Sequence, residues 1–356
     1  MRTQVRELVE QGLADGLFAG AAVRVIRWQG GGRVETLAEA TSGNAEITPQ
    51  PRGLTDDAVF DVASLTKVMA TLPAVLRSVQ AGRLKLDRQV LPDKGITVQH
   101  LLTHTSGLPA WKPFYLWGQG RDYYQKRIET EPLVYKPGTK AIYSDLGMIL
   151  LGFVLEDIWQ IPLEEIAREQ VFAPLGMTQT HYLCSEKNAV ATEVGNHIER
   201  KMCQDVASED IIEQFPWRTD TICGAVNDGN CHYGLSGVSG HAGLFSTAGD
   251  VLRYLQMWLE GGRDFLASEL VRLATRNHTP GLGLSRGLGW EMGVWAGETF
   301  RSDVFGHTGF TGTAVWVQPA SGTAVVSLTN RLHPVPSDLA TWRRKLHGVV
   351  FAEEAN

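Results

Sequence analysis

The chain has 356 residues, of which 43% are hydrophobic and 20% are charged, so it can bury a large core in one or two closely packed domains. Its formal net charge of -6 at pH 7 provides no basic surface of the kind that binds a phosphate backbone, which argues against a nucleic-acid partner. No apolar run approaches the roughly 20 residues of a membrane-spanning helix, so we expect no membrane span.

The N-terminal residues 1–16 predict an amphipathic helix. Val5, Leu8, Val9 and Leu13 recur at helical spacing, and charged residues stand between them. This pattern differs from that of a signal peptide. We therefore expect a cytoplasmic protein; a periplasmic location would follow if a leader had been removed.

Two β-prone runs come next, at 21–28 and 34–40, and the glycines at 30–32 between them suit an antiparallel hairpin. A helix is predicted from Ser64 to about Ala81. Its residues between 68 and 79 include a single charge, so most of its circumference should be buried.

The predicted secondary structure changes twice in the rest of the chain. From 97 to about 182 the pattern is helical and rich in loops. In the last third we expect strands at 287–294, 313–318 and 322–329, and a closing helix over about 337–351.

These elements predict an α+β fold in which an antiparallel sheet is flanked by helices. The first and last parts of the chain should share this sheet, and a mostly α-helical lobe should be inserted between its strands. We expect one domain over 1–356, with an α/β lobe at about 1–80 and 285–356 and a helical lobe at about 81–284.

Ser64 and Lys67 stand three residues apart at the start of the buried helix. This spacing places both on one helix face with Cβ atoms about 5 to 6 Å apart, so the amine can reach the hydroxyl. A serine needs a neighbouring base to become a nucleophile, and the N–H groups of a helix N-terminus favour the negative charge that then develops. Taken alone, the pair is also explained by an N-capping serine with a lysine in the first turn.

Two further motifs follow in the chain. Tyr143, in Tyr-Ser-Asp after a Pro-Gly turn, could accept and return a proton, although a buried tyrosine with a satisfied hydroxyl is the plainer alternative. His307, Thr308 and Gly309 precede a predicted strand, where glycine permits close approach of a substrate and the two polar side chains can bind it. A glycine-rich turn explains this motif alone, but not the three motifs in order.

With these motifs, and with Leu-Leu-Thr-His-Thr-Ser-Gly-Leu-Pro at 101–109, the chain resembles the class C β-lactamases, the penicillin-binding proteins and the related esterases and D-amino-acid peptidases. The resemblance spans most of the chain. It implies a β-lactamase/transpeptidase-like fold, an acyl-enzyme on Ser64, and Lys67 and Tyr143 as the shared base and acid. It further implies that residues 307–309 align the substrate and that the backbone N–H groups of Ser64 and Phe310 form the oxyanion hole. No metal or other cofactor is implied.

The chain departs from the family pattern at two positions. Many members have Asn at the position of Asp145, where a carboxylate should raise the pKa of Lys67 and make Tyr143 the better base. β-Lactamases usually have Lys at the position of His307, and a mostly neutral imidazole attracts a substrate carboxylate less strongly.

We therefore expect a serine hydrolase that cleaves esters or peptide-like amides of modest size. The alternatives are a β-lactamase or D-alanyl-D-alanine carboxypeptidase, and a non-catalytic protein with a penicillin-binding fold. Ser285, in Gly-Leu-Ser-Arg-Gly, is a weak second candidate for the nucleophile because no helix is predicted after it. Asp228 and His241 lie in glycine-rich segments that could line the cleft or form turns.

Overall fold

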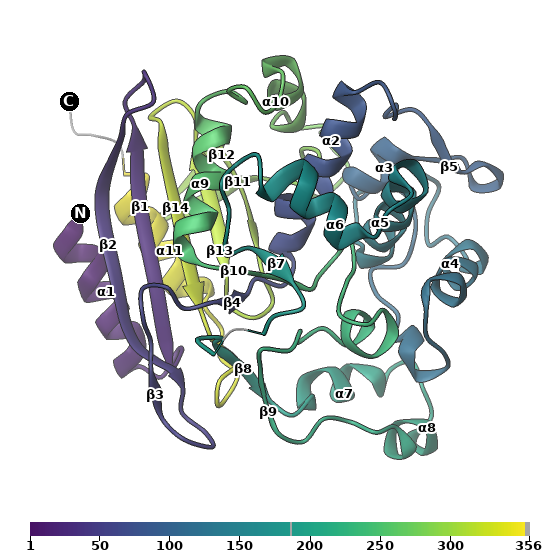
Figure 1. The fold of residues 1–356 in the computed structure, drawn as a ribbon, viewed down its shortest axis with the longest axis horizontal. Helices are drawn as coiled ribbons and strands as arrows, with labels where there is room; N and C mark the ends of the chain where they lie inside the picture. Colours follow the sequence, from purple (N-terminus) through teal and green to yellow (C-terminus); the bar gives the residue numbers. More distant parts are fainter. Residues whose placement is uncertain (186, 353–356) are drawn as a thin grey trace.

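A seven-stranded antiparallel sheet forms one side of the molecule in the computed structural model, which describes residues 1–185 and 187–352 (Figure 1). The strand order is β11-β12-β13-β14-β1-β2-β3. The strands are β1 (Gly20–Trp28), β2 (Val34–Glu46), β3 (Arg52–Gly53), β11 (Glu291–Ala296), β12 (Thr299–Thr308), β13 (Ala314–Gln318) and β14 (Thr323–Thr329). Strand β1 pairs with both β2 and β14, so the first and last parts of the chain share one sheet, as predicted.

Helices cover both faces of this sheet. Helices α1 (Arg2–Ala14) and α11 (Ala340–Val350) pack on one face, and α9 (Ala248–Leu259) packs on the other against β14 and β1. Side chains along β1 alternate accordingly: Val23 and Val25 join the cluster under α1 and α11, whereas Ile26 joins the larger core. A strand covered on both faces is apolar on both, which explains the nearly continuous hydrophobic runs in β1 and β14.

Among the longer strands of this sheet, β12 was not predicted, and the start of β11 was misplaced. Strand β12 was missed because most of its residues before Val304 are exposed in a two-stranded hairpin with β11, so they show no apolar alternation. The predicted strand at 287–294 begins too early. Trp290 is fully buried in a loop against the rings of Trp258 and Phe305, so its hydrophobicity reflects the core and not a strand.

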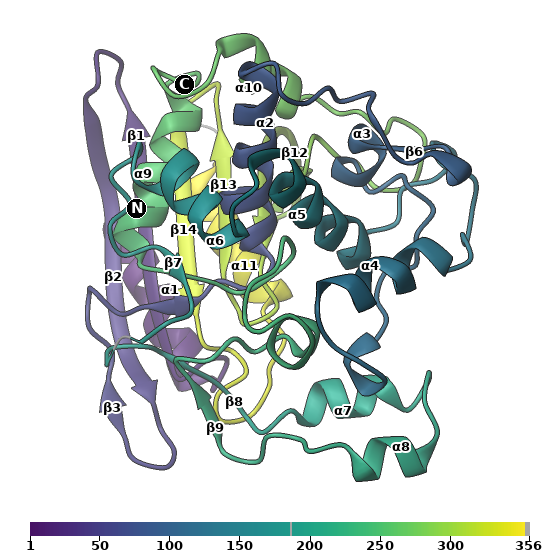
Figure 2. The same ribbon diagram turned by 45° about the vertical axis from the view of Figure 1, so that its right-hand side comes forward.

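The remaining elements lie mostly on the other side of the molecule (Figure 2). The helices are η1 (Lys67–Thr71), α2 (Leu72–Gln80), η2 (Pro92–Lys94), α3 (Val98–Leu102), η3 (Phe114–Leu116), α4 (Arg121–Thr130), α5 (Asp145–Trp159), α6 (Leu163–Ala167), η4 (Arg168–Phe172), α7 (His197–Cys203), α8 (Glu209–Gln214), η5 (Asn230–Gly234) and α10 (Ser268–Ala274). The short strands are β4 (Phe60–Asp61), β5 (Gln89–Leu91), β6 (Ile96–Thr97), β7 (His181–Tyr182), β8 (Ala191–Val194), β9 (Thr221–Cys223) and β10 (Leu244–Ser246). The division into lobes near 80 and 285 stays a prediction, although α9 lies within the expected helical lobe and packs on the sheet.

The predicted central helix is present from Leu65 to Gln80 and includes one π-helical stretch, η1. All residues of η1 are buried, in agreement with the low charge of this segment. Helix α5 crosses beside it with ten successive buried residues, 146–155. No single helix in 1–185 and 187–352 is long and apolar enough to cross a membrane, although α5 and the bent segment 163–172 reach that length and composition together.

Candidate active site

Ser64 occupies the turn between strand β4 and the central helix. Strand β4 ends at Asp61, whose carboxylate accepts a hydrogen bond of 2.8 Å from the backbone N–H of Ala63. Ala63 has a φ of 47°, in the left-handed region that a residue with a Cβ rarely adopts. The helix begins directly after Ser64, so the turn holds its hydroxyl at a helix N-terminus.

The Lys67 side chain is fully buried, and its Nζ atom lies close to several oxygen atoms. Ser64 Oγ lies 3.0 Å away, the carbonyl oxygen of His241 lies 2.8 Å away, and Asp145 Oδ1 lies 2.8 Å away. The contact between the amine and the hydroxyl that the spacing predicts is therefore present. Burial by itself lowers the pKa of Lys67, but the Asp145 carboxylate and Tyr143 outweigh it, so that pKa is raised and the amine is an ammonium ion at neutral pH.

Tyr143 lies just before α5, with Ser144 as the helix N-cap and Asp145 in the first turn. Its ring centroid is 5.0 Å from Lys67 Nζ, and its hydroxyl interacts with Lys67 and Ser64. Burial raises the pKa of Tyr143, and the nearby ammonium ion offsets this only in part. The resting side chain is therefore a neutral phenol, which can take the Ser64 proton only by passing its own proton on.

His307 and Thr308 form the end of β12, paired with Val315 and Ala314 of β13. The His307 ring is buried and stands 5.8 Å from the Tyr143 ring, and its Nε2 atom has no hydrogen-bond partner within 1–185 and 187–352. Burial, Arg286 and Lys67 hold its pKa well below the usual range, so the imidazole is neutral at pH 7. This agrees with the expectation that His307 attracts a carboxylate only weakly.

Gly309 lets this strand end lie against the turn that carries Ser64. A Cβ atom at Gly309 would lie 2.6 Å from the carbonyl oxygen of Val62, too close for any other residue. Within the described chain, the backbone N–H groups of Ser64 and Phe310 have no hydrogen-bond acceptor. Both are thus available to an oxyanion, as the resemblance implies, and the assignment of the oxyanion hole stays a prediction.

A cavity of about 490 Å³ opens over these groups. The residues that line it include Ser64, Tyr143, His307, Thr308, Gly309, Phe310, Arg286, Glu291, Arg331, Asp338, Leu339 and Arg343. The cavity thus brings together the predicted site residues, except Lys67 and Asp145, which lie behind Ser64 and Tyr143.

The arginines of this cavity were not predicted from the sequence. Arg286 is 7% exposed, stands over the Tyr143 ring at 5.4 Å, and has no hydrogen-bond acceptor for Nε or Nη1 among the residues described. It lies in a loop between α10 and β11, and no local motif marks it. Only the folded structure shows that this loop places the positively charged Arg286 side chain in the cavity.

Asp228 and His241 lie behind Lys67, not among the residues that line this cavity. His241 Nε2 lies 2.9 Å from Asp228 Oδ1, and His241 Nδ1 lies 2.7 Å from Ser239 Oγ. Since the His241 carbonyl accepts a hydrogen bond from Lys67, this chain of contacts fixes one acceptor of the ammonium group. No group of three or more His, Cys, Asp or Glu side chains in the part described is arranged to hold a metal.

The comparisons with known proteins agree with this fold. A family model described as "Beta-lactamase" matches residues 5–349, and the chain belongs to this family. An Escherichia coli K12 protein named "Putative D-alanyl-D-alanine carboxypeptidase" is 31% identical over 331 residues, which cover 82% of this chain and 73% of that protein. An N-acetylmuramyl-L-alanine amidase from Bacillus subtilis 168 is 32% identical over 377 residues, covering 93% and 81%. Among solved structures, the hydrolase EstCE1, with promiscuous acyltransferase activity, superposes with a TM-score of 0.74 at 21% identity and covers 98% of both chains.

These findings establish a β-lactamase-fold serine hydrolase, as predicted. The β-lactamase/transpeptidase-like fold class is confirmed, since a class C β-lactamase also superposes with a TM-score of 0.72 at 18% identity over 99% of this chain and 96% of its own.

Proposed function

We propose that the protein hydrolyses peptide-like amides that end in a free carboxylate, through an acyl-enzyme on Ser64. The observation that carries this proposal is Arg286, a buried arginine whose Nε and Nη1 atoms have no hydrogen-bond partner among the described residues, in the cavity that contains Ser64 and Tyr143. An unpaired buried guanidinium is costly, and a carboxylate is its best planar partner. The names of the carboxypeptidase and amidase relatives support an amide substrate.

The contacts suggest a role for each residue in the reaction. Ser64 Oγ attacks the substrate carbonyl, while the Tyr143 hydroxyl takes the serine proton and passes its own proton to the leaving nitrogen. The Lys67 ammonium ion, held by Asp145 and the His241 carbonyl, stabilises the negative charge that develops between them. Water then attacks the acyl-enzyme by the reverse proton path and releases the acid.

Arg286 also changes which of the alternative substrate classes is favoured. The sequence favoured neutral esters as well as amides. A neutral ester, however, leaves the Arg286 guanidinium without a partner. β-Lactams carry a carboxylate that could contact Arg286, so β-lactam hydrolysis is the second candidate.

The first test is covalent labelling of Ser64. Incubation with a fluorophosphonate should add one adduct to the intact mass, and peptide mapping should place it on Ser64. Labelling of Ser285 would overturn the site, and no labelling would favour a non-catalytic protein. The Ser64→Ala variant should be unlabelled and inactive while keeping the wild-type melting temperature.

The second test separates the substrate classes. We expect faster release of D-alanine from an acylated D-Ala-D-Ala peptide acid than cleavage of its C-terminal carboxamide, p-nitrophenyl acetate or a chromogenic cephalosporin. Arg286→Gln should lower kcat/KM for the peptide acid by about 10- to 100-fold, the value of a charged hydrogen bond, and leave the carboxamide unchanged. Arg272→Gln, on an exposed part of α10, is the control. Equal losses on acid and carboxamide would exclude carboxylate recognition by Arg286.

A further inference from the structure

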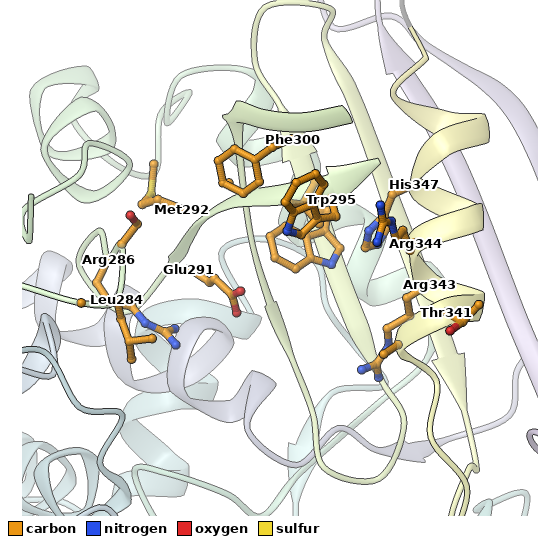
Figure 3. Close-up of a pocket in the computed structure, with 16 residues that line it drawn as sticks. Leu284, Arg286, Glu291, Met292, Trp295, Phe300, Thr341, Arg343, Arg344 and His347 are labelled. Atoms are coloured by element: carbon orange, nitrogen blue, oxygen red, sulfur yellow. The ribbon is translucent and has the colours of Figure 1, made fainter. Parts of the chain in front are cut away.

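A second hollow of about 560 Å³, shown in Figure 3, shares lining residues with the catalytic cavity. It lies between the β11–β12 hairpin and α11, with Trp295 and Phe300 on the hairpin and Thr341 and His347 on the helix. Arg286, Glu291 and Arg343 line both spaces. The two hollows therefore share a boundary, and we refer to them together as the cleft.

Two large aromatic side chains form a wall of the second hollow. Trp295 is 52% exposed and Phe300 is 50% exposed, and their ring centroids are 5.5 Å apart. A Cβ atom at Gly293 would lie 2.3 Å from the Phe300 ring, so this glycine lets the phenyl group lie against the strand. Neighbouring exposed aromatic rings that line a concave surface are typical of ligand sites.

Positive charge prevails along the cleft. The charged residues described along the two hollows are Arg286, Arg331, Arg343, Arg344, Glu291 and Asp338. Arg344 stands 5.0 Å from the Trp295 ring and is paired with Glu298 at 2.8 Å. Burial lowers the pKa of His347 to about 4, so this residue adds no charge at neutral pH. Arg286 and Arg343, at the junction, each keep a buried nitrogen atom without a hydrogen-bond partner in the part of the chain described.

We propose that this hollow is a second substrate subsite, which binds a ring-shaped group bearing a carboxylate, at a distance from the bond that is cleaved. The ring lies on Trp295 and Phe300, and its carboxylate faces Arg343 at the junction, since Arg286 is assigned to the terminal carboxylate of the substrate. A sugar acid and an aryl acid share this chemistry. The inference rests on the proposed function, because it assigns the hollow to the substrate of Ser64.

The binding test needs no turnover. Calorimetric titration of the Ser64→Ala protein would compare methyl β-D-glucuronide with methyl β-D-glucoside, and 2-naphthoate with 2-naphthamide. At least one acid should bind ten-fold or more tightly than its neutral partner, and the acid that binds identifies the kind of ring. Trp295→Ala with Phe300→Ala should weaken that binding at least ten-fold, while Trp117→Ala, 45% exposed outside the cleft, should not. Absence of binding by both acids, or binding unaffected by the double variant, would overturn the subsite.

Kinetics then distinguish this inference from the proposed function. In the active enzyme, the same double variant should lower kcat/KM at least ten-fold for a D-Ala-D-Ala peptide whose N-terminus carries the acid that binds, and leave the unextended peptide unchanged. Equal effects on both substrates would reject the subsite while hydrolysis on Ser64 stands. If neither substrate is cleaved by the wild type, the proposed function fails, and the titration still decides whether the hollow binds the acid. Trp295→Ala alone replaces the double variant if the latter unfolds.

Discussion

Lys67 Nζ lies 2.8 Å from Asp145 Oδ1, and this ion pair sets the charge state of the site. The lysine is fully buried, whereas the aspartate side chain is 17% exposed. A buried ammonium ion without a counter-charge would lose its proton, but here the carboxylate keeps the pKa of Lys67 raised. Lys67 therefore acts as a cation in the resting site, as the Asp at this position led us to predict.

The first prediction concerns Asp145→Asn. Loss of the carboxylate should lower the pKa of Lys67, so the alkaline limb of the pH profile of kcat/KM should move to lower pH by about 1 to 3 units. Asp145→Glu keeps the charge and should leave the limb near its wild-type position. An alkaline limb that stays in place in Asp145→Asn would show that the ammonium form is not required.

The second prediction concerns Tyr143→Phe. Without the hydroxyl, no group can pass the Ser64 proton to the leaving nitrogen, so kcat should fall by about 100- to 10,000-fold, with little change in KM. The aromatic contacts to His104 and His307 remain, so the melting temperature should stay close to that of the wild type. Tyr123→Phe is the control. A kcat within ten-fold of the wild type would assign the proton transfer to another group.

The third prediction concerns His241 as a positioning residue. His241→Asn cannot keep both the contact to Asp228 and the contact to Ser239, so the carbonyl that binds Lys67 should shift. A displacement of about 1 Å in a catalytic group can cost about 100-fold in rate. We expect kcat to fall by about 10- to 100-fold and the alkaline limb of the profile to move, with KM nearly unchanged.

Ser239→Ala removes only one of these contacts and should have a smaller effect on kcat. The melting temperature and the pH profile distinguish a positioning role of His241 from a purely structural one. A lower melting temperature with an unchanged pH profile would show a purely structural role.

The fourth prediction concerns the pH dependence of stability. Glu199 is buried, and burial is the main cause that raises its pKa to about 8, from 4.5 for the exposed group. Because the folded chain then holds this proton more tightly than the unfolded chain, the Glu199 contribution to the free energy of unfolding falls as pH rises through this interval. Glu199→Gln should gain stability relative to the wild type, by roughly 1 to 4 kcal/mol between pH 5 and pH 9.

Urea unfolding at several pH values tests this prediction. The exposed Glu213→Gln on α8 is the control and should show no such trend. A constant difference in stability between Glu199→Gln and the wild type would mean that Glu199 is ionised in the folded protein throughout this range.

Local signals in the sequence were sufficient for much of the fold. The spacing of Val5, Leu8, Val9 and Leu13 predicted α1, and the low charge after Val68 predicted the buried central helix. Strand β12 could not be predicted from such local signals, because an exposed hairpin beyond the core needs no apolar alternation. The length of this hairpin is set by pairing with β11, which is a contact between segments and not a property of either one.

For the candidate site, the sequence by itself determined the pairing of Ser64 with Lys67, and the tertiary structure decided what surrounds this pair. The step from Ser64 to Lys67 is one helical turn, so backbone geometry alone places the amine beside the hydroxyl. No such local rule joins Arg286 to Tyr143, or the His241 carbonyl to Lys67, because these residues are 143 and 174 positions apart and meet only when the loops pack. The contact between the Lys67 amine and the Ser64 hydroxyl could therefore be predicted from spacing, whereas the position of Arg286 in the cavity depends on contacts that only the folded chain creates.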